Sequence, residues 1–552
     1  MVNRLVRPET VFFLCVWLVV LVAFRERGFY DPGALWHVKV GELILDRGFP
    51  HTDPFTYTYE GRTWIPQQWG AEVLMALAHR VGGLDAMLLG FATLVAGLFT
   101  LIFRRATRSG MGPLLAALVV GGALSVGAFH YFVRPHMFTI ALLGWTMTCV
   151  VDFERGRCGA GRLAWLIPLF AVWTNLHGGV LGGVLTLGLA VAGWGAVFLL
   201  KKPTPPAPFP RKEGGAEAVQ ASRPGYGTGS GESFLPHTPV RSWRTAFLLV
   251  AIVAACGLTP FVNPFGMEML DTWARIVGSK VLPQVINEHM PLDPTSPLGL
   301  TVIAAGAAYL FLLAGALPKC PRVSWLIPLA WLVLSFKGVR QGPLFAITAA
   351  VAAVDLWPHT VWHRLLEKYG DGSLARAPDA EPHRGPGWVA MLLPAAAVLL
   401  ALGLQVTRVE VPVVGRGWAR LDPDFIPSDL TAEMQAYAAT VPPGTPIFND
   451  ANLGGYLIYH TPGLKIFMDD RCELYGDEEI AYYAETLGLP PAELGPRFED
   501  WAARFRFHRA IIMTEPAGRD RPPIEEYLLG SPDKWREVAR GKRAAVFERV
   551  RR

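Results

Sequence analysis

The stretch from Asp31 to Trp69 gathers the residue types that could do acid–base chemistry. It contains two Asp-Pro pairs, at Asp31 and Asp53, and a Trp-His pair that ends at His37. A carboxylate within hydrogen-bond reach of a hydroxyl group can act as a general base, so we interpret Asp31 and Asp53 as candidate catalytic residues and His37 as a candidate substrate contact. The second carboxylate could instead hold a divalent metal ion, Mg or Mn, or position an acceptor. A structural role stays open for both: Asp31 as the cap of a helix over residues 32–46, and Asp53 as a turn residue before a β-hairpin.

Further polar side chains stand in short segments between long hydrophobic ones. Arginine suits phosphate recognition because its planar guanidinium can grip two oxygen atoms at once. Cations at a membrane interface also extend toward lipid phosphates without any further role, and the histidine of TNLHGG could be a hydrogen-bonded structural residue. The functional interpretation makes these residues a candidate substrate-binding set: Arg134, His136, Asn175, His177, Glu288, His289, Lys337 and Arg340.

Hydrophobic segments must hold these residues in place. Of the 552 residues, 51% are hydrophobic and 18% are charged, whereas a soluble protein has about 25% charged residues. Apolar runs near 20 residues recur along the first three quarters of the chain, which is typical of membrane-spanning helices. We therefore predict a polytopic α-helical membrane protein with about eleven transmembrane helices. A surface helix over residues 71–82 is expected to lead into the second of them. The predicted segments are 9–24, 84–103, 112–129, 137–152, 163–176, 179–200, 245–262, 298–317, 323–336, 341–357 and 387–405.

Lysine and arginine residues concentrate in alternate loops, which indicates the orientation by the positive-inside rule. With the N-terminus in the cytoplasm of a plasma (inner) membrane protein, every inner loop is basic and the candidate site residues all fall on the outer face. Residues 25–83 then form the first outer loop, and residues 203–243, rich in Pro, Gly and Ser, form a disordered cytoplasmic linker. No basic stripe indicates nucleic-acid binding. The basic residues of the inner loops are Arg104, Arg105 and Arg108; Arg155, Arg157 and Arg162; Lys201, Lys202, Arg211 and Lys212; Lys319 and Arg322; and Arg364, Lys368, Arg376 and Arg384.

Residues 406–552 have the composition of a soluble domain, which the alternation places outside the membrane. Short apolar strands alternate there with helical stretches, a pattern typical of an α/β domain. Asp450, Asp470 and Arg471 stand at the ends of expected strands, where α/β domains bind ligands, so we interpret them as candidate acceptor contacts, with plain turns as the alternative. The expected strands are TPIFND, GGYLIYH, LKIFMDD, RAIIMT and AAVFERV.

The chain resembles the GT-C class of integral-membrane glycosyltransferases, in a bacterial branch related to protein mannosyltransferases and lipid A aminoarabinose transferases. The resemblance rests on the first outer loop with its early acid, on DPGALWHVKVGELILDRGFPHTDPFTYT and WIPQQWG, and on the many helices that follow. It implies transfer of a sugar from polyprenyl phosphate to a lipid, glycan or protein acceptor on the extracytoplasmic face, with Asp31 in the position of the catalytic acid of the class and Asp53 second. This chain has Gln68 where relatives are expected to carry an acid, and Pro32 where several branches carry a second one.

Two other functions stay open, a transporter or flippase and a non-catalytic assembly factor for lipid-linked glycans. Transporters place charges in mid-membrane segments, whereas the hydrophobic segments here are nearly free of charge and the polar groups collect at one surface. This distribution favours chemistry at the surface.

Overall fold

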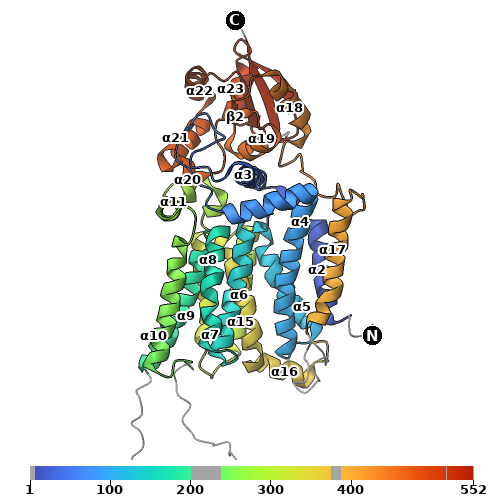
Figure 1. Cartoon of the computed structure of the whole chain (residues 1–552), viewed down its shortest axis with the longest axis vertical. Helices are drawn as coiled ribbons and strands as arrows, with labels where there is room; N and C mark the ends of the chain where they lie inside the picture. Colours follow the sequence, from blue (N-terminus) through green and yellow to red (C-terminus); the bar gives the residue numbers. More distant parts are fainter. Residues whose placement is uncertain (1–5, 201–237, 375–386, 517–518, 551–552) are drawn as a thin grey trace, which may run out of the picture.

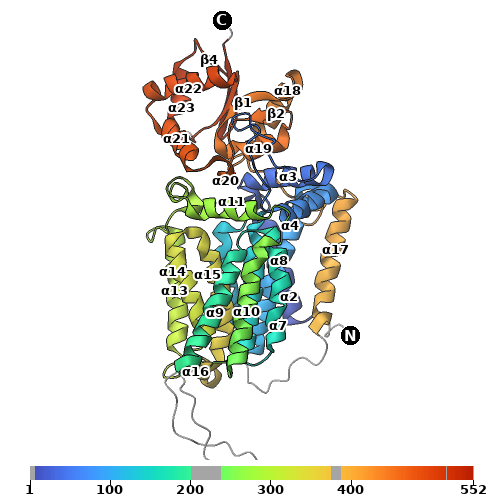
Figure 2. The ribbon, with the colours of Figure 1, turned by 60° about the vertical axis from the view of Figure 1, so that its left-hand side comes forward.

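The computed structural model describes residues 6–200, 238–374, 387–516 and 519–550. A bundle of long helices carries a C-terminal α/β domain at one end (Figure 1). Helices α3 (Gly33–Arg47) and α11 (Met267–Gly278) lie across that end, between the bundle and the domain (Figure 2). Most of the predicted linker 203–243 lies outside the described residues, and so does part of the last basic loop, which otherwise holds α16 (Val361–Tyr369).

Each of the predicted hydrophobic segments contains a helix, and residues 163–176 are divided between α7 and α8. Among the described residues, 8 helices are long and apolar enough to cross a membrane, and α2 and α14 are shorter apolar helices. The chain is a multi-pass membrane protein; the number of eleven crossings stays a prediction. The bundle helices are α2 (Pro8–Ala23), α4 (Trp69–Arg108), α5 (Pro113–Gly127), α6 (His136–Glu154), α7 (Ala160–Ala164), α8 (Leu166–Leu176), α9 (Val180–Leu200), α10 (Trp243–Leu258), α13 (Pro297–Ala314), α14 (Val323–Lys337), α15 (Gly342–Leu356) and α17 (Leu392–Val406).

Helix α4 turns a corner at Gly83, whose φ of 64° interrupts the helical backbone. The part before Gly83 lies across the end of the bundle and the part after it runs down through the bundle (Figure 1). The predicted surface helix over 71–82 is therefore present. Helix α3 packs closely on this part because Gly41 has no side chain: a Cβ there would lie 2.0 Å from the carbonyl oxygen of Glu72.

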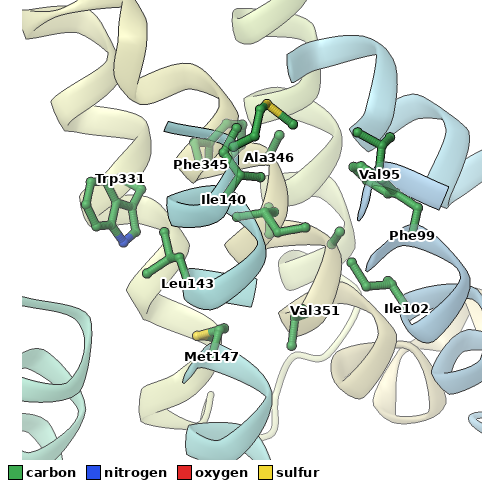
Figure 3. Close-up of a cluster of buried hydrophobic side chains, with 14 of the residues drawn as sticks. Val95, Phe99, Ile102, Ile140, Leu143, Met147, Trp331, Phe345, Ala346 and Val351 are labelled. Atoms are coloured by element: carbon green, nitrogen blue, oxygen red, sulfur yellow. The ribbon is translucent and has the colours of Figure 1, made fainter. Parts of the chain in front are cut away.

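The centre of the bundle is built around α15, almost all of which is buried against α4, α6 and α14 (Figure 3). Lipid is as apolar as a leucine side chain, so membrane helices associate through close packing, which small residues permit. The α15 sequence AITAAVAAV supplies such residues, and Gly144 of α6 leaves room for Ile347. This core holds the ends of the helices, and therefore the loops between them, in fixed positions.

The C-terminal domain contains a five-stranded sheet of order β2-β1-β3-β5-β4. Strands β2, β1 and β3 are parallel, and β5 and β4 run antiparallel. The sequence predicted an α/β domain but missed β4. The elements are α18 (Thr431–Thr440), β1 (Thr445–Asn449), α19 (Gly454–His460), β2 (Leu464–Ile466), α20 (Cys472–Tyr475), α21 (Asp477–Gly488), α22 (Pro491–Phe505), β3 (Arg509–Met513), α23 (Pro523–Gly530), β4 (Trp535–Arg540) and β5 (Ala544–Arg549).

The segment GGYLIYH, expected as a strand, forms helix α19 instead. Its apolar run is buried on almost all sides, and such a short run does not distinguish a strand from a buried helix. The two glycines explain the position of the helix. A Cβ on Gly455 would lie 2.3 Å from the carbonyl oxygen of Pro32, so α19 rests directly on the start of α3.

The predicted first outer loop, residues 25–83, joins the edge of this sheet. Thr56 forms a parallel bridge with Ile466 of β2, supported by backbone hydrogen bonds from Tyr57 to Ile466 and from Ile466 to Phe55. The predicted hairpin is reduced to one antiparallel bridge between Thr52 and Thr63. The loop thus extends the C-terminal sheet, and this pairing fastens the domain to the membrane part.

The described residues of the basic loops predicted to lie inside are found at the other end of the bundle. Arg105 and Asp152 are 2.9 Å apart, and Asp355 lies 2.8 Å from Arg155 and 3.6 Å from Arg157. The candidate site residues lie at the end that carries the C-terminal domain. The two predicted sets of loops are therefore separated as the alternation requires.

Candidate active site at the mouth of the helix bundle

A cavity of about 500 Å³ lies where the bundle meets the C-terminal domain. Its lower wall comes from the ends of α6, α9, α14 and α15, and its upper wall from α3, α11 and the segment that follows β2. The apolar part of the lining includes Leu181, Leu185, Trp331, Leu334 and Leu344. The polar part includes Trp36, Gln67, Gln68, His130, Arg134, His136, His177, Glu288, His289, Arg340, Asp470 and Glu473.

Arg134 lies at the centre of the charged groups of this cavity. It stands in the short loop before α6, where its guanidinium donates a hydrogen bond to Asp31 and lies 3.6 Å from the carboxylate of Asp470. Burial lowers the pKa of Arg134, but Asp31, Asp470 and Glu288 more than offset this, so the pKa is raised and the charge is permanent. Gly33 leaves the space for this arrangement, because a Cβ there would lie 2.8 Å from both Arg134 Cζ and Asp470 Oδ2.

Asp31 holds Arg134 from outside the cavity lining. One oxygen accepts from the Arg134 guanidinium, and the other accepts from the backbone N–H of Gly33 at 2.8 Å. Asp31 therefore stabilises a turn at the start of α3 and at the same time forms an ion pair with a residue of the cavity. Neither oxygen is left without a partner.

Asp470 reaches the cavity from the C-terminal domain. Its Oδ1 accepts a hydrogen bond from the indole N–H of Trp36 at 2.6 Å, and the Trp36 ring lies against His37 with the ring centroids 3.7 Å apart. Burial raises the pKa of Asp470 to about 7; Asp31 and Asp469 add to this shift, while Arg134 and Trp36 oppose it. A carboxyl group with this pKa can exchange a proton at neutral pH.

The histidines of the cavity supply neutral hydrogen-bonding groups. His177 Nδ1 accepts from the backbone N–H of Gly179 at 2.9 Å, and burial lowers the pKa of His177 to about 3. His289 Nε2 lies 2.8 Å from a guanidinium nitrogen of Arg340; because arginine only donates, this histidine accepts and is uncharged. Burial, with Arg340, lowers the pKa of His289 to about 4. The positive charge of the cavity therefore resides on Arg134 and Arg340.

His136 and Glu288 complete the predicted residues that line the cavity. His136 Nε2 lies 2.6 Å from the carbonyl oxygen of His130, in the same short segment as Arg134. Glu288 is partly exposed and lies about 4 Å from His130 and His289.

Asp53 and Arg471 lie elsewhere, in a buried ion pair between the first outer loop and the C-terminal domain. The closest nitrogen and oxygen atoms are 2.8 Å apart, and neither side chain is exposed. Arg471 also pairs with Asp469 at 2.7 Å, and its guanidinium lies 4.6 Å from the centre of the Trp64 ring. Burial raises the pKa of Asp53, but Arg471 and Thr56 outweigh it and hold the pKa below its ordinary value. This position does not support the interpretation of Asp53 as a second catalytic acid. Its carboxylate takes part in the ion pair that joins the loop to the C-terminal domain.

The other candidates outside the cavity lining also have identifiable contacts or positions. His37 Nδ1 pairs with Glu72 at 2.9 Å in a fully buried site behind Trp36. Asn175 accepts from the Trp69 indole and donates to the carbonyl of Val262, which ties three segments together. Lys337 is exposed at the end of α14. Asp450 caps a short helical turn by accepting from the backbone N–H of Asn452 at 3.0 Å.

Sequence reasoning missed several lining residues. His130 precedes Arg134 by only four residues, so its position beside Arg134 and His136 could have been inferred. Glu473, which follows Arg471 closely, had no signal of its own. Within the described ranges, no group of three or more His, Cys, Asp or Glu side chains could hold a metal ion.

No family model and no curated protein matches the chain. Among solved structures, it is similar to the arabinofuranosyltransferase AftD from Mycobacteria, with 14% identity and a TM-score of 0.49 over 99% of this chain and 40% of that one; the chain thus spans two fifths of AftD. It is also similar to ArnT from Cupriavidus metallidurans, solved bound to undecaprenyl phosphate, with 14% identity and a TM-score of 0.48 over 98% of each chain. Both are GT-C glycosyltransferases, the class that the sequence resembles.

Proposed function

We propose that this protein is a membrane glycosyltransferase that moves a sugar from a polyprenyl-phosphate donor to an acceptor on the extracytoplasmic face of the inner membrane. One observation carries the proposal: two arginines, Arg134 and Arg340, face a single cavity, and the part of its wall formed by α9, α14 and α15 is lined by apolar side chains. This combination suits a ligand with an anionic head and a hydrocarbon tail.

The two ends of such a donor have separate partners in the cavity. Arg134 and Arg340 would bind the phosphate, and neutral histidines beside them can donate or accept hydrogen bonds without adding charge. Leucine side chains of α9, α14 and α15 would contact the first prenyl units. The arginines also stabilise the charge that the phosphate gains when the sugar leaves.

The reaction is a displacement at the anomeric carbon, with inversion. The acceptor hydroxyl oxygen forms a bond to that carbon, the bond from the carbon to the phosphate oxygen breaks, and its electron pair stays on the phosphate. The hydroxyl proton passes to a carboxylate, and the acids beside Arg134 are Asp31 and Asp470. The acceptor, a lipid, glycan or protein, would approach from the side of the C-terminal domain.

The test compares Arg340→Gln with Lys337→Gln, two neutralisations three positions apart in the sequence. The first removes a cavity cation and the second an exposed one outside the lining. Loss of a charge-assisted hydrogen bond costs about 1.5–3 kcal/mol, so undecaprenyl phosphate should bind roughly 10- to 100-fold more weakly to Arg340→Gln. Transfer from labelled undecaprenyl-phosphate pentoses and hexoses should fall with it.

Equal binding by the two variants would overturn the assignment of the phosphate site. The wild-type protein could instead bind undecaprenyl phosphate, transfer and release no sugar, and move the lipid between leaflets. That result would support the flippase alternative.

A further inference from the structure

Three carboxylate residues line the cavity, and they differ in their partners. Glu473 accepts from the Trp64 indole at 3.3 Å, and Glu288 is partly exposed, lies about 4 Å from His130 and His289, and acts on Arg134 and Arg340 from a longer distance. Asp470 is the one within ion-pair distance of Arg134. In an inverting displacement the acceptor oxygen and the leaving phosphate oxygen stand on opposite sides of one carbon, so the base must reach the acceptor oxygen within the same cavity that holds the phosphate.

Asp470 is held by a chain of contacts that runs back into α4. Glu72 pairs with His37, the His37 ring lies against the Trp36 ring, and the Trp36 indole donates to Asp470 Oδ1. The other oxygen, Oδ2, lies 3.6 Å from Arg134, a distance longer than a hydrogen bond. It is therefore the less committed oxygen of the pair and the one that can take a proton.

The first outer loop fixes the backbone on both sides of Asp470. Its neighbours Asp469 and Arg471 belong to the buried ion pair with Asp53, and the strand before them pairs with Thr56. Asp470 thus enters the cavity only when the C-terminal domain is seated on that loop.

We propose that Asp470 of the C-terminal domain is the catalytic base that accepts the proton of the acceptor hydroxyl, and that Asp31 acts as a positioning residue for Arg134. This inference rests on the proposed function. The proton goes to Asp470 Oδ2 as the new glycosidic bond forms, and the electron pair of the broken bond remains on the polyprenyl phosphate beside Arg134 and Arg340. The site is therefore shared between the two parts of the chain.

The protonation of Asp470 supports this role. Burial raises its pKa to about 7, so the carboxylate form is lost as the pH falls below neutrality and gained above it. The groups that act on it directly are Arg134, Asp31, Asp469 and Trp36. Cys472 and Glu473 follow Asp470 in the same segment, and the other titratable residues of the lining are Arg340, Glu288 and the histidines His130, His136, His177 and His289.

The experiment compares full-length Asp470→Asn with Asp500→Asn, the same substitution at an exposed position of α22 in the same domain. Wild-type transfer should rise tenfold per pH unit below about pH 7 and then level off. Removal of a general base costs about 10²- to 10⁴-fold, so Asp470→Asn should lose at least a hundredfold in rate and lose this pH dependence, with undecaprenyl phosphate binding retained. Asp500→Asn should behave as the wild type.

Wild-type turnover in Asp470→Asn, or lower turnover with an unchanged pH dependence, would overturn the inference while leaving the proposed function in place. A wild-type protein that transfers no sugar would overturn the proposed function first. If Asp470→Asn does not fold, Trp36→Phe gives an independent answer. It keeps a ring over His37 but removes the hydrogen bond that lowers the pKa of Asp470, so the pH at half-maximal rate should move upward; an unmoved value would contradict the assignment.

Discussion

Replacement of Asp53 by asparagine should unfold the protein more easily without removing its chemistry. Asp53 and Arg471 form an ion pair at 2.8 Å, and both side chains are fully buried. The variant leaves the arginine with Asp469 as its charged partner and an amide in place of the second carboxylate. A buried charge that loses one of its partners destabilises the folded state because water cannot replace the lost contact.

The magnitude follows from burial. Breaking a buried pair costs about 3–5 kcal/mol, whereas an exposed pair is worth about 0–1 kcal/mol. The matched control is Asp46→Asn, whose partner Arg80 lies 2.5 Å away but whose side chain is 60% exposed. For a unit of the size of the C-terminal domain, residues 406–552, the melting temperature shifts by about 2–4 °C per kcal/mol. The unfolding transition of this domain should therefore fall by about 10 °C in Asp53→Asn and by no more than a few degrees in Asp46→Asn.

The pH dependence has a definite sign. The pKa of Asp53 is held below its ordinary value of 3.8 in the folded protein. Its contribution to stability is therefore fully present above that value and is lost as the pH falls through the lower pKa of the folded state. The difference in stability between wild type and Asp53→Asn should shrink only below about pH 4.

Thermal unfolding in detergent and sugar transfer well below the melting temperature together test this account. Folded Asp53→Asn should transfer sugar at a rate near that of the wild type. Loss of transfer with an unchanged melting temperature would refute the reasoning and would favour the catalytic role that the sequence alone predicted for Asp53.

Three further substitutions test other parts of the site. Asp31→Asn should weaken undecaprenyl phosphate binding and transfer roughly 10- to 100-fold, because Arg134 loses the partner that positions it. The transfer rate should still increase with pH up to about pH 7. Loss of this pH dependence would instead identify Asp31 as the base. Gly33→Ala should lower transfer tenfold or more at an unchanged melting temperature, because its Cβ displaces the ends of Arg134 and Asp470; Gly90→Ala, whose Cβ meets nothing within 4 Å, is the control, and equal rates would contradict the expectation. Gly455→Ala should loosen α19 from α3 and make the C-terminal domain more sensitive to protease, since its Cβ meets backbone at Pro32; Gly463→Ala, with open space around it, should not.

The membrane part could be predicted from the sequence because its signals are local. Apolar runs gave helices in every predicted segment, and alternating basic loops correctly separated the two ends of the bundle. Arg134, His177 and Arg340 were expected together and line one cavity. Each of these inferences depends on composition within about 20 residues or on simple alternation of helices.

Long-range pairing could not be predicted in the same way. Trp36 and Asp470 are 434 positions apart, and nothing in the periodicity around either residue identifies the other. The same holds for Asp53 and Arg471. The sequence around Asp53 suggested a catalytic role, but the position of Asp53 is set by an arginine far away in the sequence. GGYLIYH illustrates the related failure for local structure, since a short buried apolar run adopts the form that its surroundings require.

The central claim is that polar residues from distant loops form one site for a lipid phosphate at a single end of the bundle. A cryo-electron microscopy structure of the full chain with undecaprenyl phosphate tests it directly. The phosphate should lie between Arg134 and Arg340, with Asp470 beside it and the prenyl chain along α9 and α14. A phosphate bound at the opposite end of the bundle, or the two arginines facing separate cavities, would contradict the claim.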